Sequence, residues 1–516
     1  MKRFFTLIFA IGMVGILSAQ DEHEMIIEST GVGILEQTIF GDTMPTGERV
    51  DPDRVYVLRR GTPYLLGEIV DVADFHLRLK AEGGDGNKPI LILNVGDGVN
   101  AVDQMFVASS GGHITLEGLH LAGQDIFGIN TNRIIRINGD KSRVSVNDCI
   151  LDYSGQSGFR LNADSIKVFV SNTIIDRMGQ LNDPNNGRFL DNRGHPIDSL
   201  WVTNCIIYDI TSRIYRHGGD AAYLHHAKID QCTFFGSGQW GFTFSPSDEL
   251  TFTNNIVANP VFLGYSGEQR YAMTIDTFRD GDQIDISYNN FFTSPAFDEA
   301  LPETASGSDI SMDGDTVYSV NGDYFGPQIS NAMAASASST TNFSEVLEFA
   351  NAPEIQQDFI DNTYDSTATL GVWDFSDLTP DPDYSLVGGA TAVDRYTTFH
   401  DFSYPESAQS FTAGTSGQKI GADLSNLGTD VKEDFFVRDN ILFYPNPVRS
   451  ELFIQNLDEA DLHSIMIYDL KGVPVREQKV RASNAVLQLP DVPSGTYILT
   501  IRDKAGKVSS RKLIKN

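Results

Sequence analysis

The chain has 516 residues and a formal net charge of −31 at pH 7, from 38 Lys and Arg against 69 Asp and Glu. A chain of this length exceeds what one hydrophobic core usually supports, so we expect at least two domains. The acidic balance argues against nucleic acid as a partner, because nucleic-acid binding depends on cationic surfaces.

The first 19 residues have the layout of a secretory signal peptide. Lys2 and Arg3 precede an apolar run over 4–17, and small residues end the segment at Ala19. This order predicts cleavage after Ala19, and an uncleaved anchor is the alternative. No later stretch is apolar enough to span a bilayer, so we expect a secreted or cell-surface protein with no membrane span in its mature form.

Residues 20–328 contain a strand unit that repeats. The clearest copies and three looser ones run over 143–150, 167–174, 200–206, 228–233, 250–256 and 284–291. Each copy carries a polar residue at its turn, 23 to 35 residues after the previous one, and these ladder residues are Asp148, Asn172, Asn204, Gln231, Asn254 and Asn289. One short strand that alternates apolar and polar residues cannot bury its apolar side alone, so the copies must stack. The pattern predicts an all-β right-handed parallel β-helix with a ladder of amide side chains at one turn.

The three cysteines occupy one position of this repeat. Cys149, Cys205 and Cys232 each follow a ladder residue directly, and Thr173 and Asn255 take the same position in other copies. A shared position inside the stack predicts buried, reduced thiols that act as small apolar side chains, and argues against disulfides or a metal site.

Two further segments extend the β-helix interpretation. Short apolar strands and glycine-containing turns over 55–119 resemble the opening coils of pectate-lyase-like proteins, and residues 381–390 resemble the closing strand of secreted β-helix proteins. We expect residues 329–405 to form a loop-rich tail that packs on the β-helix. Residues 406–439, rich in Ser, Thr and Gly, are expected to form a linker.

The last segment, residues 440–516, differs from the rest in charge and pattern. It carries 11 Lys and Arg against 8 Asp and Glu, and alternating strands follow the motif Tyr-Pro-Asn-Pro at 444–447. Strands joined by Gly and Pro turns predict a small C-terminal β-sandwich. The segment resembles the type A C-terminal sorting domain of the type IX secretion pathway. That resemblance implies export through the periplasm by the type IX secretion machinery, removal of the domain, and release or surface attachment.

Two sets of outward-facing residues could bind an acidic polysaccharide. Trp201 could stack on sugar rings with Lys228 near an acid group, although ordinary strand decoration is the alternative. Arg136 and Arg160 each lie 12 residues before a ladder residue, so they should stack on adjacent coils about 4.8 Å apart. Two cations this close favour a bound anion between them or exposure to water.

Basic residues are densest over 188–217, where Arg193 and Arg216 lie 23 residues apart, the length of one minimal coil. Arg216-His217-Gly218 resembles the Arg-His-Gly motif of the chondroitinase B and alginate lyase family, which is also built on a right-handed β-helix. The resemblance implies that Arg216 neutralises a uronate carboxylate for β-elimination, with a Lys base and Ca²⁺ nearby.

The chain departs from that family at two places. Asn192-Arg193-Gly194 stands where the family has Asn-Lys-Ser, and residues 188–191 replace its calcium-binding glutamates. Arginine is a poor general base, so His217 would take the base role. The metal ligands stay unknown.

The sequence therefore favours an exported, lyase-like protein that acts on uronate-containing polysaccharide. Its expected catalytic residues are Arg216, His217 and Arg193, and its expected substrate-binding residues are Trp201, Lys228, Arg136 and Arg160. A non-catalytic glycan-binding or adhesive β-helix is the main alternative. A glycoside hydrolase that uses a carboxylate pair such as Asp230 and Asp285 is a third.

Overall fold

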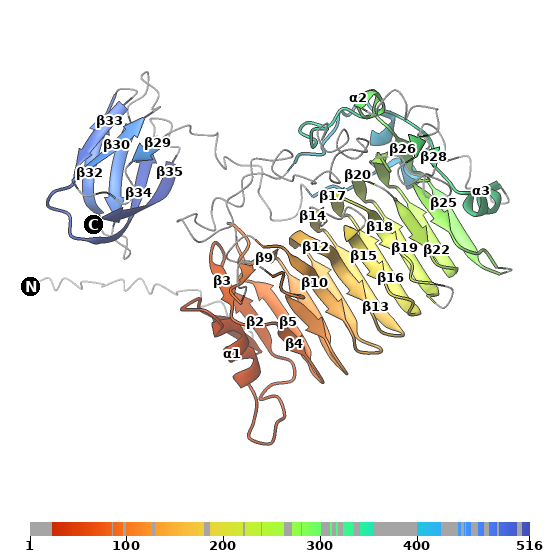
Figure 1. The fold of residues 1–516 in the computed structure, drawn as a ribbon, viewed down its shortest axis with the longest axis horizontal. Helices are drawn as coiled ribbons and strands as arrows, with labels where there is room; N and C mark the ends of the chain where they lie inside the picture. Colours follow the sequence, from red (N-terminus) through yellow and green to blue (C-terminus); the bar gives the residue numbers. More distant parts are fainter. Residues whose placement is uncertain are drawn as a thin grey trace, which may run out of the picture.

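The computed structural model describes residues 23–515 except for the segments 85, 96–99, 126–128, 180–185, 220–221, 239, 263–270, 280, 301–309, 312–315, 318–323, 335–340, 356–399, 425–441, 445–447, 449, 456–462, 469–473, 482–483 and 503–507. The signal peptide predicted over 1–19 lies outside the described residues, as do parts of the predicted tail and linker. Parallel strands stacked in coils form most of the remainder (Figure 1), and an antiparallel β module follows.

The coils have three faces made of parallel strands. Face 1 is a ten-stranded sheet of β1 (Glu24–Ile27), β2 (Val55–Leu58), β5 (His76–Ala81), β8 (His113–Glu117), β11 (Arg143–Asn147), β13 (Ile166–Ser171), β16 (Ile197–Thr203), β19 (Leu224–Asp230), β22 (Ser247–Thr253) and β25 (Gln283–Ser287). Faces 2 and 3 belong to one larger sheet, because the long strand β12 (Ile150–Leu161) contributes its first half to face 2 and its second half to face 3.

Face 2 contains β3 (Pro63–Leu66), β6 (Ile90–Leu93), β9 (His120–Asp125), β14 (Ile174–Met178), β17 (Ile206–Ile210), β20 (Thr233–Ser237), β23 (Ile256–Pro260) and β26 (Asn290–Phe292). Face 3 contains β4 (Val70–Val72), β7 (Phe106–Ala108), β10 (Thr131–Ile137), β15 (Arg188–Asn192), β18 (Arg213–Arg216), β21 (Phe242–Phe244) and β24 (Met273–Ile275). The predicted all-β fold with parallel stacked coils is confirmed.

The repeat stacks in register, as its alternation requires. In β13, Val168 and Val170 point into the core, while Phe169 between them points outward. Val168 pairs with Val144 on the coil before and with Leu200 on the coil after. Apolar inward residues of consecutive coils therefore stack on one another, and each coil buries the apolar side of its neighbours.

The ladder position is a turn between face 1 and face 2 that needs a left-handed backbone. The φ angles of Asp148, Asn172, Asn204, Gln231 and Asn254 lie between 51° and 58°. Asn and Asp tolerate this region better than other side chains, which explains the recurring amide. In this turn Asn204 Nδ2 donates directly to Asn172 Oδ1 at 2.8 Å.

The last ladder assignment is wrong by one residue. Tyr288, with φ of 59°, occupies the turn, and Asn289 lies one position later, beside Asn255. A buried amide ladder runs through that next position instead. Asn255 Nδ2 donates to Asn289 Oδ1 at 3.1 Å, and Asn289 Nδ2 donates to Asn342 Oδ1 at 2.9 Å.

The same inward column holds the three cysteines, which are free and buried, as predicted. Each thiol donates to the backbone oxygen two residues earlier, Cys149 to Asn147 and Cys205 to Thr203, both at 3.2 Å. Burial raises the pKa of Cys149 to about 12. The thiols are therefore small, unreactive core side chains.

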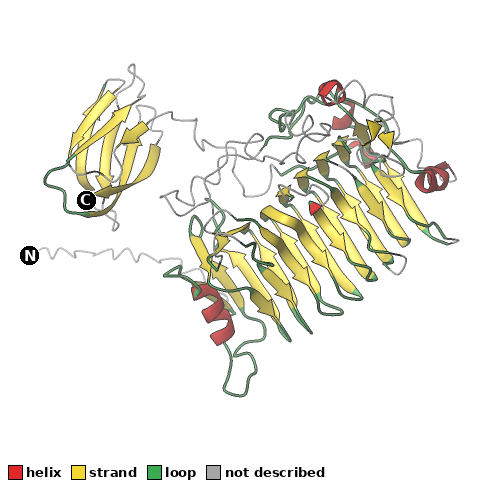
Figure 2. Ribbon diagram, viewed as in Figure 1, coloured by secondary structure: helices red, strands yellow, loops and turns green. Residues whose placement is uncertain are grey.

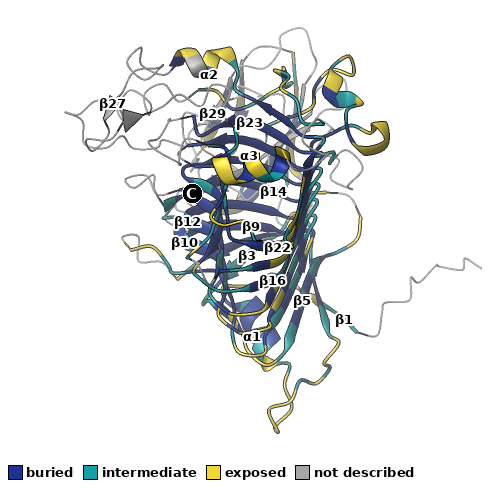
Figure 3. Ribbon diagram, turned by 90° about the vertical axis from the view of Figure 1, so that its right-hand side faces the viewer, coloured by how far each residue is buried: buried dark blue, intermediate teal, exposed yellow. Residues whose placement is uncertain are grey.

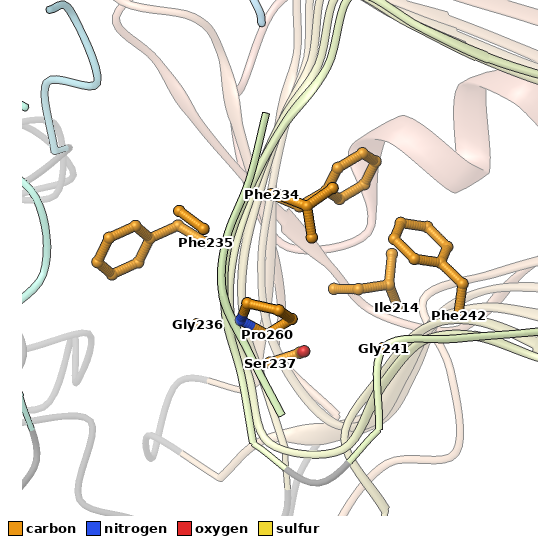
Figure 4. Close-up of a pocket in the computed structure, with 10 residues that line it drawn as sticks. Ile214, Phe234, Phe235, Gly236, Ser237, Gly241, Phe242 and Pro260 are labelled. Atoms are coloured by element: carbon orange, nitrogen blue, oxygen red, sulfur yellow. The ribbon is translucent and has the colours of Figure 1, made fainter. Parts of the chain in front are cut away.

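The interior of the stack is filled with side chains. Figure 3 shows the strands as mostly buried or intermediate, with most of the exposed residues on loops and helices. A remaining internal cavity of about 10 Å³ lies among Ile214, Phe234 and Phe242 (Figure 4). That volume is about one water molecule, so it offers no room for a ligand. Any site for a polymer must lie on an outer face.

Helices lie at both ends of the stack (Figure 2). The helix α1 (Ile34–Gly41) packs Leu35 and Ile39 against the first coils, and α3 (Pro327–Ala334) packs Ile329 and Met333 against the last. These helices cover apolar edges that would otherwise pair with other chains. Near the second end lie α2 (Pro295–Ala300) and the short strands β27 (Ile310–Ser311) and β28 (Thr316–Val317).

The chain then returns along face 2 and packs on it. Residues 341–355 and 400–424 share an apolar cluster with this face that includes Tyr208, Phe235, Phe292, Leu347, Phe402, Tyr404 and Ile420. We call residues 400–424 the strap. The strap contains two short turns of 3₁₀ helix, Gln409–Phe411 and Thr415–Gly417.

The strap crosses three ladder residues in succession. Thr415 N donates to Asn254 Oδ1 at 2.8 Å, and Gln231 Nε2 donates to Lys419 O at 2.7 Å. Asn204 both accepts from Asp423 N at 2.7 Å and donates to Asp423 O at 3.0 Å. This differs from the expected linker over 406–439, because residues 406–424 are held on the β-helix by hydrogen bonds.

Residues 442–515 form two antiparallel sheets with a shared core. One contains β29 (Leu442–Tyr444), β30 (Glu451–Gln455) and β33 (Asn484–Gln488), and the other contains β31 (His463–Tyr468), β32 (Pro474–Val480), β34 (Gly495–Arg502) and β35 (Val508–Lys515). Leu452, Ile467 and Leu499 meet between them. This confirms the predicted β-sandwich. None of the described helices is long and apolar enough to cross a membrane.

Candidate functional site

A column of polar residues crosses the outer side of face 3. Arg136 pairs with Arg160 on the next coil, as predicted from their common distance to the ladder. The column continues through Asp191 and Arg216 to Thr243, one residue per coil. Neighbouring strands lie about 4.8 Å apart, so these side chains form a continuous row along the β-helix axis.

Asp191 lies at the centre of this row and is fully buried. Its Oδ2 lies 3.0 Å from Arg160 Nη2 and 3.7 Å from Arg193 Nη1. Its Oδ1 lies 3.3 Å from Arg216 Nη1 and 4.0 Å from Arg188 Nε. One carboxylate therefore faces four guanidinium groups, which leaves an excess of positive charge around it.

Arg160 and Arg188 are the two least accessible arginines of this cluster, and burial disfavours their charged forms. Burial lowers the pKa of Arg188 to about 10, although the charge of Asp191 opposes this change. Burial likewise lowers the pKa of Arg160, and Asp191 again opposes it. A pKa near 10 still leaves the guanidinium charged at neutral pH, so the cluster is cationic under ordinary conditions.

A second carboxylate, that of Asp103, contacts the arginines on the first coil of the row. Asp103 contacts Arg133 and lies 3.2 Å from Arg136 Nη1. Gln156 Oε1 accepts from Arg133 Nη2 at 2.8 Å and from Arg160 Nη2 at 3.3 Å. Gln156 thus links the first pair of arginines to the cluster around Asp191.

Arg213 extends the cationic surface beside Arg188, its partner on the adjacent strand. Its guanidinium lies 4.1 Å from the ring centre of Trp240. Face 3 and its edge therefore carry seven arginines against four aspartates. The arginines are Arg133, Arg136, Arg160, Arg188, Arg193, Arg213 and Arg216, and the aspartates are Asp71, Asp103, Asp191 and Asp276. A net charge of about +3 on this surface contrasts with −31 for the whole chain.

His217 follows directly after β18. Burial lowers its pKa below the usual 6.5, while the charge of Asp276 opposes this effect. The ring is thus neutral at neutral pH. Gly219 N donates to His217 Nδ1 at 3.3 Å, which assigns the proton of the neutral ring to Nε2.

Arg193 is close to Arg216 but does not face it in register. The residue paired with Arg216 is Asp191, because the two strands carry an insertion relative to a minimal coil of 23 residues. Arg193 lies beyond the end of β15 and reaches the same carboxylate. Asp191 therefore brings the two arginines together through a shared contact, although they do not stack directly on consecutive coils.

Trp201 and Lys228 lie elsewhere, on face 1, where they pair with each other. Trp201 is 46 % exposed, and its ring meets Phe169 edge to face at 5.3 Å. Lys228 Nζ lies 3.3 Å from Asp230 Oδ2. The seven expected site residues thus divide between face 1, with these two, and face 3, with the arginines and His217.

The residues of face 3 do not fit a calcium ion. Calcium requires several oxygen ligands, and the carboxylates of Asp103 and Asp191 each contact arginines. Within the described part of the chain, no group of three or more acidic, His or Cys side chains is arranged to hold a metal.

Sequence reasoning missed Asp191, Arg133 and Trp240. Asp191 lies 31 residues after Arg160 and 25 before Arg216, each within the range of coil lengths that the repeat shows. That spacing was the available signal. It could not be used because the lengths of the intervening loops were unknown.

Comparisons with known proteins agree with the fold. Residues 133–297 match the family model of the right handed beta helix region, which confirms the predicted hand of the coils. Residues 442–516 match the model of the secretion system C-terminal sorting domain, so the chain carries the export signal predicted for its last segment. That match indicates a protein that is secreted or held at the cell surface. A search of curated proteins finds no match.

Among solved structures, the chain is similar to the tailspike protein gp49 from Acinetobacter baumannii bacteriophage Fri1, described as a capsular polysaccharide depolymerase. The identity is 9 %, the alignment covers 90 % of this chain and 74 % of that chain, and the TM-score is 0.24. A TM-score this low carries no argument about this chain.

Proposed function

We propose that this is an exported protein, delivered by the type IX pathway, that binds acidic polysaccharide along face 3 and cleaves it as a lyase. The observation that carries the proposal is the convergence of arginines on Asp191 in an otherwise acidic chain. Four consecutive coils of face 3 and its edge each carry at least one arginine, an arrangement that suits a polymer with an acid group at each sugar.

The arginines supply what β-elimination needs first. A guanidinium against the uronate carboxylate withdraws its charge and so acidifies the proton on C5 of that sugar. Arg216 and Arg193 are the most exposed of the four arginines around Asp191, with side chains 27 % and 37 % accessible. They are the groups that would contact the carboxylate.

His217 is the base that we assign. Its lone pair is on Nδ1, and the contact with Gly219 at 3.3 Å is long enough to give way to substrate. His217 would take the C5 proton, the C5–H electron pair would form the C4=C5 double bond, and the C4–O glycosidic bond would break. The departing oxygen would take a proton from water.

The test follows unsaturated products. The full chain is incubated with alginate, polygalacturonate and chondroitin, and ultraviolet absorbance of the new double bond is recorded. Arg216→Ala should lower turnover by about 100-fold or more, as loss of a charge-stabilising donor does. Its melting temperature should stay close to that of the wild type, because Asp191 keeps its contacts with Arg160, Arg188 and Arg193 when Arg216 is removed. Absence of turnover on every acidic polymer would reject the lyase chemistry.

A second candidate function, glycan binding without cleavage, is favoured by the exposed ring of Trp201 on face 1. An exposed aromatic ring on a flat sheet offers a stacking surface for sugars. If face 1 is the binding surface, Trp201→Ala should weaken binding while Arg216→Ala leaves it unchanged. The opposite pattern would support face 3.

A further inference from the structure

We infer that Asp191 is a positioning residue for face 3, whose buried carboxylate fixes Arg216 in the orientation that binds an anionic polymer. The inference rests on the proposed function, since it concerns the same arginines. Asp191 was absent from the residues expected from the sequence, and its full burial prevents it from touching a polymer itself.

The two oxygens of Asp191 accept hydrogen bonds from arginines on different coils. Oδ2 accepts from Arg160 Nε at 3.1 Å, on the coil before. Oδ1 accepts from Arg216 Nη1 at 3.3 Å, on the coil after. The carboxylate on β15 thereby joins three consecutive coils of face 3.

The partners also divide into an inner and an outer pair. The side chains of Arg160 and Arg188 are 14 % and 9 % accessible, so they fill the space around the carboxylate. Arg193 and Arg216 reach farther into solvent. Asp191 can therefore influence a bound polymer only through this outer pair.

Four guanidinium groups repel one another unless an anion lies between them. A long arginine side chain also has many rotamers, and ordering it when a ligand binds costs conformational entropy. A carboxylate that is fixed on a strand of the stack reduces both the repulsion and the entropy loss before the polymer binds. Arg216 is thus presented in place.

Simple charge counting makes the opposite prediction. Asp191→Asn raises the net charge of face 3 by one, which by itself should tighten binding of an anion. If Asp191 positions Arg216, the same variant should weaken binding despite the added charge. The sign of the change separates the two accounts.

The experiment measures the affinity of the full chain for alginate, a polyuronate, at fixed ionic strength. Asp191→Asn should lower the affinity by about tenfold or more, as loss of a central arginine contact does. Asp164→Asn is the matched control, because it makes the same charge change at an exposed carboxylate whose contact is His195 at 2.7 Å. It should leave the affinity within about threefold, or raise it.

A double-mutant cycle provides the readout that a merely structural role would not alter. In the Arg216→Gln background, Asp191→Asn should change affinity by less than about threefold, because the group that it positions is already gone. An equal loss in both backgrounds would overturn the inference. So would an affinity of Asp191→Asn that equals or exceeds the wild type.

If Asp191→Asn does not fold, Arg216→Lys provides the test. Lysine keeps the charge without the planar fork, so a positioned arginine predicts a loss close to that of Arg216→Gln. Affinity within about threefold of the wild type would overturn the inference. A wild-type chain that binds alginate while these variants behave as charge counting predicts rejects this inference alone. A wild-type chain that binds no polyuronate rejects the proposed function and this inference with it.

Discussion

At the scale of single residues, burial sets what each ionisable side chain can do. Asp191 stays at the centre of four arginines because leaving the pairs would strand buried charge. His217 stays neutral because burial penalises its cation. The thiol of Cys149 stays protonated because burial penalises its anion. The same physical cause thus acts on a paired carboxylate, a candidate base and an inert core residue.

The pH dependence of turnover tests the role of His217. A general base must be neutral, and burial places the pKa of His217 below 6.5. Activity should therefore be constant above about pH 6.5 and fall as pH drops through the lowered pKa of the ring. The measurement is kcat/KM on the preferred polyuronate between pH 4.5 and 8. An acidic limb centred above 6.5 would show that another group is the base.

Thiol titration tests the inward column of cysteines. Native protein should react very slowly with a thiol reagent, because all three thiols are buried and the raised pKa of Cys149 and of Cys232 leaves little thiolate at those two positions. After denaturation, three thiols per chain should react. Detection of a disulfide between Cys149 and Cys205 in the native protein would contradict the arrangement.

At the scale of elements, strand periodicity identified the stack but not its faces. Alternation in 166–171 predicts that Val168 points inward and Phe169 outward, and the structure agrees. Alternation is the same on all three faces, so it could not tell that Trp201 and Arg216 point away from different sheets. The face depends on how each coil bends. The positions of these bends cannot be read from the sequence, because the loops between repeats differ in length.

Neither the left-handed turn at Tyr288 nor the packing of the strap on the β-helix was predicted from the sequence, and the reasons are related. A left-handed turn is readable from the sequence when Asn or Asp occupies it, and Tyr288 carries no such signal. Residues 406–424 have linker composition, but their backbone groups satisfy the ladder amides, an interaction that composition does not reveal. A free linker and a segment held by hydrogen bonds can have the same polar composition, so composition alone does not distinguish them.

A matched pair of glycines tests the strap. Gly421 has φ of 75°, and a Cβ there would lie 2.5 Å from Ile256 Cδ1 and 2.8 Å from Thr233 Oγ1. Gly417 has φ of 79°, but a Cβ there meets open space. Backbone strain of about 1 kcal/mol is expected for Ala at either site, and the clash at Gly421 should add about 1–3 kcal/mol.

The measurement is the free energy of unfolding of Gly421→Ala and Gly417→Ala, compared with the wild type. Gly421→Ala should be the less stable of the two, and the strap should become sensitive to protease. Equal stability of the two variants would show that the strap does not add to the stability of the β-helix.

At the scale of the whole molecule, two β modules serve separate purposes. The β-helix has its own continuous core, and the sandwich has another, formed by residues such as Leu452 and Leu499. Their charges also differ, since residues 440–516 are net basic and the remainder is strongly acidic. Separate cores allow one module to act as an address and the other to act on a ligand.

Deletion of residues 440–516 tests this separation. The shortened chain should fold with the melting temperature of the β-helix unchanged, because no part of the stack's core is lost. It should accumulate in the periplasm, since the segment that matches the sorting-domain family is absent. Fractionation of cells and culture medium gives the distribution. Normal delivery of the shortened chain to the surface would refute the sorting role.

The central claim is that face 3, and not face 1, binds acidic polysaccharide. The most direct measurement compares the affinities of wild type, Arg216→Gln and Trp201→Ala for the same polyuronate at the same ionic strength. We predict that Arg216→Gln loses about tenfold or more and that Trp201→Ala stays within about threefold of the wild type. A large loss in Trp201→Ala together with unchanged binding by Arg216→Gln would contradict the claim and move the site to face 1.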